Sequence, residues 1–288
     1  MSYSITGTTT LTGLLGHPVS HSISPLMHNE AFRLLNLDYV YLCFDVGCET
    51  LKTAVEGLKA LGVRGFNLTM PDKTLMCELA DELTPAARLS HSVNTVIHEN
   101  GRLIGHSTDG AGYMRAVSDA GYDIIGKEIT LLGAGGAGSA ICVQAALDGV
   151  SKIHVFKRNN ASYKKTQEFI DRINRDTSCE VTLDDIADQS TLKQRIQDSF
   201  MLINSTSVGM APDVDSCLFP DASFFHPDLI VSDVIYNPRR TKLMELADQA
   251  GCKNFNGMYM LLYQGAESFA CWTKKEMPTE TIKQKFFT

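Results

Sequence analysis

Three glycines that follow an apolar stretch have the spacing needed to bind the diphosphate of a dinucleotide. Residues 127–138 read KEITLLGAGGAG, in which Gly133, Gly135 and Gly138 form G-x-G-x-x-G. The first glycine permits a tight turn, the second lets the backbone approach a pyrophosphate, and the third lets the next helix pack closely on its strand. That helix would direct free N–H groups and a positive partial charge at the phosphates. The motif predicts a nucleotide site, and a purely structural βα turn is the alternative.

Basic residues follow the next expected strand, at the place where a dinucleotide fold selects NAD or NADP. An acidic residue there would bind the ribose 2′-hydroxyl of NAD, whereas basic residues accept the 2′-phosphate of NADP. The chain has Lys157 and Arg158 at this place and no Asp or Glu. Arginine can bind a phosphate through two parallel hydrogen bonds. The pattern favours NADP and leaves NAD open, and a solvated basic loop is the alternative without function.

Two polar loops each follow a predicted strand further along the chain. They are residues 204–210 (NSTSVGM) and residues 234–238 (VIYNP). Open α/β sheets bind ligands beyond the carboxyl ends of their strands, so both loops are expected to line the nicotinamide end of a cofactor site. Asn, Ser, Gly and Pro are also turn formers, so turn structure alone explains these loops equally well.

Hydride transfer at an alcohol carbon also needs a group that takes or returns the hydroxyl proton, and Lys73 and Asp109 are candidates. Lys73 ends the stretch NLTMPDK, in which Pro71 suits the first turn of a helix. A lysine there lies at the unfavourable end of the helix dipole, so it is either an exposed residue at a small cost or a functional group. Asp109 and Ser24 equally suit helix N-caps. Ser22 suits an ST-turn.

The elements that must position these residues alternate between strand and helix patterns, which predicts an α/β protein with mainly parallel sheets. The tight-turn pair Asn100-Gly101 predicts a hairpin within residues 94–106. We expect two domains with a break near residues 107–122. Helices are expected over residues 25–35, 50–61, about 72–83, 110–121, 137–147 and 260–273, and strands over residues 12–15, 39–46, 63–69, 128–132, 152–156, 201–204 and 229–234.

Composition excludes several classes of function. The 288 residues, 44% hydrophobic and 20% charged, are typical of one large or two medium globular domains. A net charge of −7 without a basic tract argues against nucleic acid or an anionic membrane as a partner. No signal peptide or membrane-spanning run is visible, and eight cysteines without a C-x-x-C pair predict reduced thiols in the cytoplasm. His17 and His21 flank Pro18 and make a poor zinc site, so no metal is expected.

Taken together, these motifs resemble the shikimate dehydrogenase family. The resemblance covers essentially the whole chain, and residues 81–87 (DELTPAA) and the ending from Gln264 look most similar to the quinate/shikimate dehydrogenase branch. The matching stretches occur in the family's order: residues 21–25, 67–73, 93–95, 107–110, 133–137, 204–210, 236–238 and 257–264.

The resemblance implies an N-terminal α/β substrate domain, residues 1–109, with residues from about 260 to 288 packing back on it as a C-terminal helix. Residues 110–259 would form a Rossmann-type NAD(P)-binding domain, with the active site between the two. A small-molecule substrate is implied, and monomer and homodimer both stay open. The implied cofactor-binding residues are Gly133, Ala134, Gly135, Gly136, Ala137, Lys157, Arg158, Thr206, Val234, Gly257 and Met260.

The resemblance also implies roles for the polar residues of the first domain. Lys73 would exchange the proton of the hydroxyl being oxidised, and Asp109 would orient and couple to it. Ser22 and Ser24, with Tyr236 nearby, would bind the substrate carboxylate, and Thr69, Asn94 and Gln264 would bind ring hydroxyls. A site of such donors and acceptors suits a polyhydroxylated ring, because analogues without a hydroxyl leave buried polar groups unpaired.

The implied activity is reversible NAD(P)-dependent oxidoreduction of shikimate and 3-dehydroshikimate, in the shikimate pathway of aromatic amino acid biosynthesis. Met70 and Asp72 stand where many shikimate-specific members have Val and Phe, which leaves quinate and 3-dehydroquinate open as substrates. An aminoshikimate-preferring enzyme is a further alternative. A non-catalytic ligand sensor would be expected to lack the Lys73–Asp109 pair, which is present. The direction of the reaction in the cell, biosynthetic or catabolic, stays open.

Overall fold

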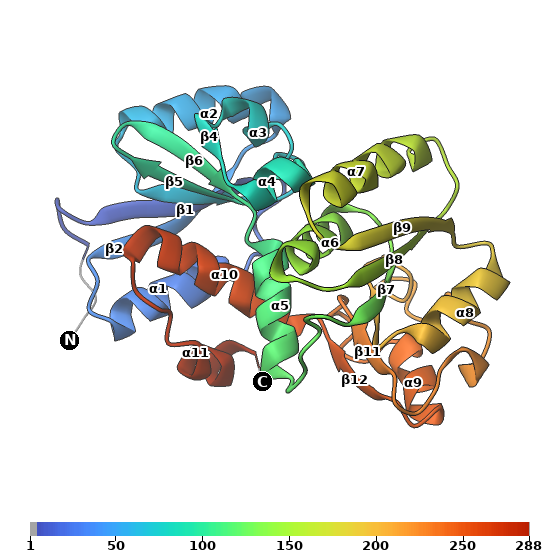
Figure 1. The fold of residues 1–288 in the computed structure, drawn as a ribbon. Coiled ribbons are helices and arrows are strands. Elements are labelled where there is room, and N and C mark those ends of the chain that lie inside the picture. Colours follow the sequence, from blue (N-terminus) through green and yellow to red (C-terminus); the bar gives the residue numbers. More distant parts are fainter. Residues whose placement is uncertain (1–4, 288) are drawn as a thin grey trace. The chain divides into compact units, whose positions relative to one another are not determined.

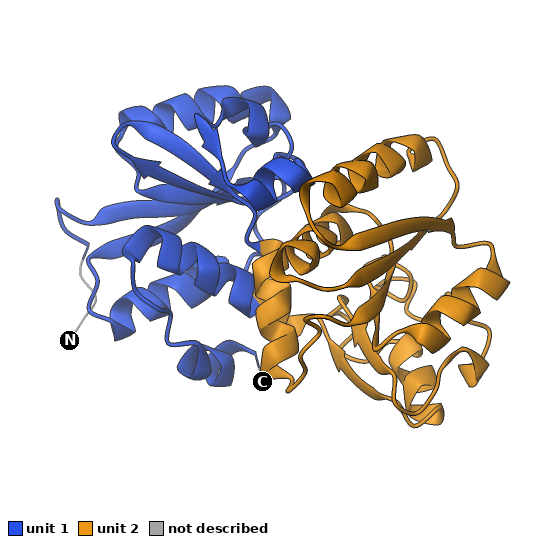
Figure 2. Ribbon diagram, viewed as in Figure 1, with its two compact units in different colours: residues 1–108, 262–288 blue, residues 109–261 orange. Residues whose placement is uncertain are grey.

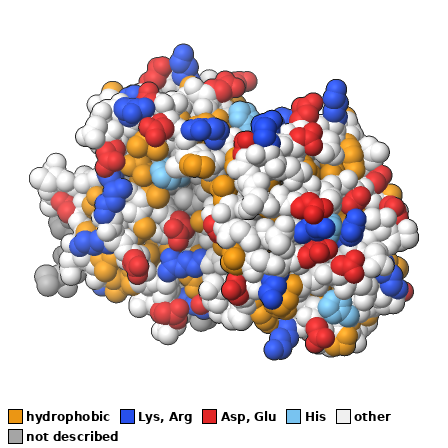
Figure 3. Space-filling model, in the orientation of Figure 1, with side chains coloured by type: hydrophobic (Ala, Val, Ile, Leu, Met, Phe, Trp, Pro, Cys, Tyr) orange, Lys and Arg blue, Asp and Glu red, His pale blue; other side chains and the backbone are white. Residues whose placement is uncertain are grey.

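Two α/β units make up residues 5–287, the part of the chain that the computed structural model describes (Figure 1). Unit 1 extends to Thr108 and resumes at Leu262, and unit 2 comprises Asp109–Leu261 (Figure 2). Residues 1–4 and 288, the ends of the expected first domain, lie outside the described residues. The α/β fold class is confirmed. Over the face visible in Figure 3, acidic and basic side chains are interspersed on both units.

Unit 1 is built on a mixed sheet with the strand order β2-β1-β3-β5-β6-β4 among the described residues. Its strands are β1 (Thr10–Gly16), β2 (Tyr39–Asp45), β3 (Gly65–Leu68), β4 (Glu82–Leu83), β5 (Thr95–Glu99) and β6 (Arg102–His106). β1 pairs in parallel with β2 and β3, whereas β5 is antiparallel to both β3 and β6. The sheet is therefore mainly parallel, as expected, and becomes antiparallel only at β5, in the hairpin expected within residues 94–106.

Helices cover both faces of this sheet in unit 1. Helix α2 (Cys48–Ala60) lies on one side, and α1 (Ser24–Leu34) and α10 (Met258–Thr273) lie on the other (Figure 1). The indole N–H of Trp272, in α10, donates to the carbonyl of Val96 in β5 at 2.9 Å. Helix α11 (Thr279–Phe286) is tied to α1 by the ion pair of Lys285 with Glu30. The expected return of the C-terminal helix to the first domain is thus confirmed.

The hairpin predicted from Asn100-Gly101 is present and has the turn that these residues favour. Both central residues have positive φ, +52° for Asn100 and +75° for Gly101, which matches the twist of the flanking strands β5 and β6. The register pairs Thr95 with His106. This pairing brings the two ends of the hairpin, and the polar residues just outside it, next to each other.

The prediction of one helix over residues 72–83 is wrong. Residues 70–75 form turns, α3 (Met76–Leu79) is a single turn of helix, and β4 follows at Glu82–Leu83. The cause is tertiary pairing, because the Asp81 carboxylate accepts from the Leu103 N–H at 2.7 Å and the Asp81 N–H donates to the Leu103 carbonyl. This pairing extends the sheet next to β6, and α4 (Pro85–Ser90) begins only afterwards. The helix-dipole argument for Lys73 therefore loses its basis, since no long helix begins there.

Unit 2 is built on an all-parallel sheet with the order β12-β11-β10-β7-β8-β9 among the described residues. Chain order reverses between β7 and β10, which is the switch point at which doubly wound sheets bind nucleotides. This Rossmann order confirms the expected fold class of the second half. The strands are β7 (Glu128–Leu132), β8 (Lys152–Lys157), β9 (Glu180–Asp185), β10 (Met201–Asn204), β11 (Ile230–Asp233) and β12 (Lys253–Asn256).

Helices cover both faces of the sheet in unit 2 as well. Leu192, Ile196 and Leu243 pack with Leu132 and Phe156 in one apolar cluster on the side of α8 and α9. Because both faces are covered, the inner strands β7, β8, β10 and β11 are buried along nearly their whole length rather than on alternate residues, whereas the edge strands β9 and β12 are more exposed. The helices are α5 (Asp109–Asp119), α6 (Gly136–Asp148), α7 (Tyr163–Asp176), α8 (Gln189–Asp198), α9 (Lys242–Gln249) and the 3-10 turn Ala222–Phe224. Within residues 5–287, no helix combines the length and apolarity needed to cross a membrane.

Candidate functional site

The glycine turn of unit 2 has the geometry that the motif requires. Gly133 has φ +93°, and its N–H donates to the carbonyl of Phe156 at 2.8 Å. A Cβ at Gly138 would come closer than 3.0 Å to the Gly133 carbonyl oxygen and the Ser205 hydroxyl, so α6 packs against the turn as only glycine allows. At Gly135 a Cβ would meet nothing within 4 Å, which leaves the approach from solvent open. Gly135 is also the N-cap of α6 and has no side chain to cap the first N–H groups.

The loop after β10 is fastened to this glycine turn. The Ser205 hydroxyl donates to the carbonyls of Leu132 and Gly133, at 2.7 and 3.1 Å. The next residue, Thr206, donates from its backbone N–H and its hydroxyl to Oδ1 of Asn204, at 3.1 and 2.8 Å. Two predicted cofactor residues from distant sequence positions, Gly133 and Thr206, are therefore brought together at the switch point of the sheet.

The loops after β11 and β12 are similarly close to each other. A Cβ at Gly257 would overlap with the backbone of Val234, so this contact requires glycine. The Gly257 N–H also donates to the carbonyl of Ile235 at 3.2 Å. Met260 is buried in the first turns of α10, whereas Tyr236 is 48% exposed. The structure thus brings Val234 and Gly257 together and leaves Tyr236 with its ring at the surface of unit 2.

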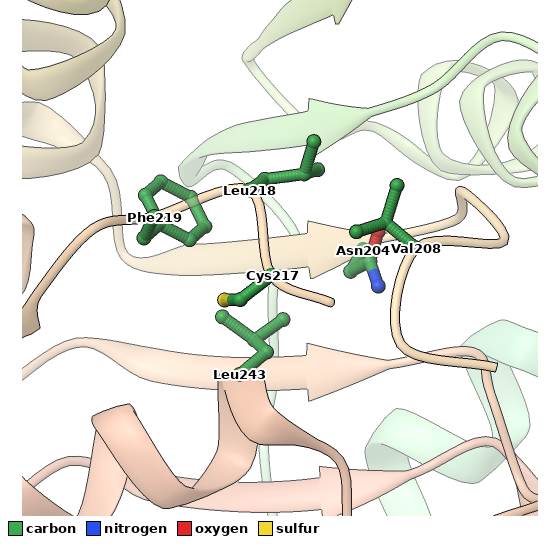
Figure 4. Close-up of a pocket in the computed structure, with 6 residues that line it drawn as sticks. All are labelled: Asn204, Val208, Cys217, Leu218, Phe219 and Leu243. Carbon is green, nitrogen blue, oxygen red and sulfur yellow. The ribbon is translucent and has the colours of Figure 1, made fainter. Parts of the chain in front are cut away.

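A small cavity lies under the loop after β10 (Figure 4). Its empty space of about 170 Å³ includes open solvent and leaves no room for a water molecule, so it is not a ligand site. Apart from the amide of Asn204, its lining is mainly apolar. We interpret it as imperfect packing beneath the loop. The lining residues are Asn204, Val208, Cys217, Leu218, Phe219 and Leu243.

The two residues predicted to bind a 2′-phosphate, Lys157 and Arg158, have different surroundings at the end of β8. Lys157 donates to Oδ1 of Asn160 at 3.1 Å and to the hydroxyl of Ser162 at 2.8 Å, and it lies over the ring of Tyr163. Desolvation, with a smaller effect of the Arg158 charge, lowers the pKa of Lys157. Arg158 is exposed, so its guanidinium can meet a ligand from solvent. Lys157 therefore shapes the loop, and Arg158 is the better candidate for contact with a phosphate.

In unit 1, Asn94 is the centre of a buried polar cluster. Its Nδ2 donates to the hydroxyl of Thr108 at 3.0 Å and, more weakly, to Oε1 of Gln264 at 3.5 Å. Its Oδ1 accepts from the N–H of Thr108 at 2.7 Å. The Thr108 hydroxyl also bonds the Gln264 carbonyl at 3.1 Å. Two predicted ring-hydroxyl ligands, Asn94 and Gln264, are thus neighbours although 170 positions separate them.

Asn67 connects this cluster to the rest of the unit. Its Nδ2 donates to the hydroxyls of Thr95 and Ser268, at 3.0 and 2.9 Å, and its Oδ1 accepts from Tyr41 at 2.8 Å. Buried polar groups that are satisfied in this way fix one arrangement of the side chains. Sequence reasoning did not single out Thr95, Thr108 or Ser268. The only local signal was that Thr95 and Thr108 fall within residues 93–95 and 107–110, two of the stretches that match the family.

Lys73 and Thr69 lie on the turns that follow β3. The Lys73 carbonyl accepts from the N–H of Val93 at 2.9 Å, which fixes the lysine backbone directly beside Asn94. The Thr69 N–H donates to the Leu15 carbonyl at 3.0 Å. Next to Lys73, Asp72 is fully buried, and burial raises the pKa of its carboxyl, an effect that the Cys48 thiol partly offsets.

The predicted carboxylate ligands lie at the start of α1, and the predicted partner of Lys73 begins unit 2. The Ser22 hydroxyl accepts from the N–H of Ser24 at 3.2 Å, as expected of an ST-turn. Ser24 is the first residue of α1 rather than its N-cap, which is Ile23. Asp109 likewise is the first residue of α5, half-buried, and follows Thr108 of the polar cluster directly. Among residues 5–287, no group of three or more His, Cys, Asp or Glu side chains is arranged to hold a metal ion.

Comparison with known proteins identifies relatives over nearly the whole chain. Residues 14–96 match the family model "Shikimate dehydrogenase substrate binding domain", and residues 257–285 match "Shikimate 5'-dehydrogenase C-terminal domain". A curated shikimate dehydrogenase (NADP(+)) of Listeria monocytogenes serotype 4b (strain F2365) is 50% identical over 283 residues, 98% of this chain and 97% of the relative.

Solved structures give the same result. A shikimate 5-dehydrogenase from Listeria monocytogenes in complex with shikimate and NAD has a TM-score of 0.96 and 49% identity, covering 99% of this chain and 98% of that one. A quinate dehydrogenase from Corynebacterium glutamicum in complex with NAD has a TM-score of 0.85 and 28% identity, covering 97% of this chain and 99% of that one.

Proposed function

Because the chain belongs to the shikimate dehydrogenase family, we propose that it catalyses the reversible oxidation of shikimate to 3-dehydroshikimate, with NADP as the favoured acceptor. The observation that carries this proposal is the bond between the Val93 N–H and the Lys73 carbonyl, which holds a potential acid–base lysine beside Asn94. A lysine next to a buried amide suits proton exchange at a ring that carries several hydroxyls.

The described residues of unit 2 fit a dinucleotide. The open space at Gly135 and the uncapped start of α6 suit a pyrophosphate, because phosphate oxygens accept from N–H groups at a helix N-terminus. We propose that residues 133–137 hold the diphosphate, that Arg158 meets the adenosine end, and that Thr206, Val234, Gly257 and Met260 line the nicotinamide end. A bound nicotinamide accepts the hydride when the alcohol is oxidised.

We propose that Lys73 takes the hydroxyl proton as the alcohol is oxidised and returns it in the reverse reaction, with Asp109 orienting it. Thr69, Asn94 and Gln264 bind ring hydroxyls, and Ser22, Ser24 and Tyr236 bind the carboxylate. Neutral hydroxyl donors can hold a carboxylate without a salt bridge, although more weakly than an arginine would. In this proposal residues 1–109, with the chain from about 260, supply most of the substrate contacts, and residues 110–259 supply most of the contacts to the cofactor.

Quinate is the alternative substrate that a specific observation favours. Met70 is 77% exposed at the turn before Lys73, where many shikimate-specific members have Val, and the structural relatives include a quinate dehydrogenase. Initial rates with shikimate and quinate, each with NAD and NADP, test the proposal. We expect the highest kcat/KM for shikimate with NADP. Turnover with none of the four combinations would refute the proposed function.

We also propose that the enzyme works in the cytoplasm, as a monomer or a homodimer. The cysteines among the described residues are free thiols, as is usual in a reducing compartment. Light scattering on the purified chain distinguishes the two oligomeric states. A disulfide-linked species that resists mild reductant would contradict the cytoplasmic assignment.

A further inference from the structure

We propose that Asp233 is a positioning residue that holds the loops at the nicotinamide end of the cofactor site in their binding arrangement. The inference rests on the proposed function, because it assigns to those loops the contacts with the dinucleotide. Asp233 is the last residue of β11 and is completely buried. Its carboxylate is one of the few buried charged groups of unit 2, and sequence analysis did not single it out.

Three segments of unit 2 donate hydrogen bonds to this one carboxylate. Oδ1 accepts from Nδ2 of Asn204, at the end of β10, at 3.0 Å, and from the N–H of Ile235 at 3.1 Å. Oδ2 accepts from the hydroxyl of Thr241 at 2.7 Å. Thr241 in turn caps α9, with its oxygen accepting from the Met244 N–H. Asp233 thus links two loops and the start of a helix.

The bond to Asn204 fixes which way its amide group points. With Nδ2 directed at Asp233, the amide oxygen Oδ1 faces Thr206 and accepts from both its N–H and its hydroxyl. The Thr206 hydroxyl oxygen then accepts from the Val208 N–H at 3.2 Å. The position of Thr206, a proposed cofactor residue, therefore depends on Asp233 through one intermediate side chain.

The bond from the Ile235 N–H to Asp233 likewise fixes the loop after β11, residues 234–238. The Ile235 carbonyl accepts from the Gly257 N–H, and Gly257 lies against the backbone of Val234. Three proposed cofactor residues on three loops, Thr206, Val234 and Gly257, are thereby organised around one carboxylate. Asp233 itself is buried beneath these loops, so it acts through them.

The energetics of this carboxylate are unfavourable at neutral pH, which argues for a role other than stability. Burial raises the pKa of Asp233 to about 6, although bonds from Thr241, Ile235 and Asn204 lower it. A carboxyl whose pKa is higher in the folded protein stabilises the fold at low pH and loses this contribution as pH rises through about 6. The ionised form nevertheless suits its surroundings, because the Asn204 amide NH2 and the Ile235 N–H can only donate and the Thr241 hydroxyl donates to Oδ2.

Other titratable groups near Asp233 do not ionise in the same range. On α5, burial raises the pKa of Tyr113 above its usual range, and the charge of Asp233 adds to the effect. On the loop before β11, burial raises the pKa of Cys217, which Asp233 raises further and Lys242 of α9 lowers. Because the pKa values of Tyr113 and Cys217 are both raised, Asp233 is the group among these three that titrates between about pH 5 and 7.

The test compares Asp233→Asn with Asp228→Asn, a control at an exposed acid of the preceding turn. With its NH2 group directed at the Thr241 hydroxyl, which can also accept, an amide of the same shape keeps the three contacts but loses the negative charge that strengthens them. We expect the Kd for NADP from calorimetry and the KM for NADP to rise about tenfold, while the KM for shikimate stays within about twofold. In the wild type, kcat/KM for NADP should fall below about pH 6, and this acidic limb should be absent from the variant.

The outcomes separate this inference from the proposed function. Asp233→Asn with unchanged NADP affinity and an unchanged acidic limb would overturn the positioning role. If the variant does not fold, as judged by circular dichroism, Asn204→Ala tests the same link and should weaken NADP binding by a similar factor. Absence of turnover by the wild type with shikimate or quinate would refute the proposed function, whereas calorimetric NADP affinity would still decide the role of Asp233.

Discussion

Replacement of Gly138 by alanine tests the glycine turn through a matched set of variants. The added methyl group would come closer than 3.0 Å to the Gly133 carbonyl oxygen and to Oγ of Ser205. The serine side chain can adopt another rotamer, but the carbonyl belongs to a residue with φ +93° whose N–H is bonded to Phe156. The first turn of α6 must therefore move away from the glycine turn.

The expected magnitude follows from two opposing effects. Overpacking of this kind costs about 1–3 kcal/mol. Alanine recovers up to about 1 kcal/mol over glycine within a helix. The net loss of about 1–2 kcal/mol should lower the Tm of a unit of this size by roughly 2–8 °C. Displacement of the helix N-terminus should also weaken NADP binding about tenfold or more, because the first N–H groups no longer point at the phosphates.

Gly57→Ala and Gly135→Ala are the controls for this experiment. Gly57 lies within α2, and its Cβ would meet nothing within 4 Å, so the substitution should raise the stability by about 0.5–1 kcal/mol. Gly135 also has open space around its Cβ, so its variant should change the Tm little and still lose NADP affinity. The assays are calorimetric unfolding and NADP titration. Equal Tm changes for Gly138→Ala and Gly57→Ala, with NADP affinity intact, would refute the reasoning.

Three further predictions concern the proposed catalytic lysine, the cofactor and pH. Lys73→Ala should lower kcat by a factor on the order of 10² or more with little change in KM, and near-normal initial rates would exclude its acid–base role. Arg158→Ala should raise the KM for NADP about tenfold but leave that for NAD unchanged, whereas Lys157→Ala should have the smaller effect; the reverse order would contradict the loop geometry. Arg33 and a lysine of α11 lower the pKa of Glu30 to about 2. The Glu30 carboxylate therefore stabilises the fold above 4.5, the pKa of the unfolded state. This contribution should be lost as pH falls toward 2, and denaturant unfolding of Glu30→Gln should show a deficit at neutral pH that disappears in acid.

Local signals in the sequence predicted those parts of the fold in which neighbouring residues determine the structure. The turn at Asn100-Gly101 could be predicted because these two residue types readily adopt the positive φ angles that it requires. The strand before Gly133 could be predicted from its apolar run and the glycine that follows it. In the Rossmann half the same kind of signal predicted the strands β7, β8, β10 and β11 and the helix α6, whereas β9, β12 and the helices α7, α8 and α9 were not predicted.

Tertiary pairing is what the sequence could not reveal. The helix expected over residues 72–83 is interrupted because Asp81 pairs with Leu103, a partner 22 residues away. The bonds between Asn67 and Ser268, and between Asn204 and Asp233, likewise join residues without any local pattern. The roles proposed for Lys73 and Asp109 came from the family resemblance, since each residue alone suits an ordinary structural position.

Transfer of deuterium from substrate to cofactor tests the central claim most directly. The enzyme would be incubated with NADP and shikimate that carries deuterium at the carbon bearing the oxidised hydroxyl, and the reduced cofactor analysed by mass spectrometry. Hydride transfer predicts that the deuterium appears in the reduced nicotinamide, in proportion to the 3-dehydroshikimate formed. Reduced cofactor without deuterium, or deuterium released to water, would contradict the proposed reaction.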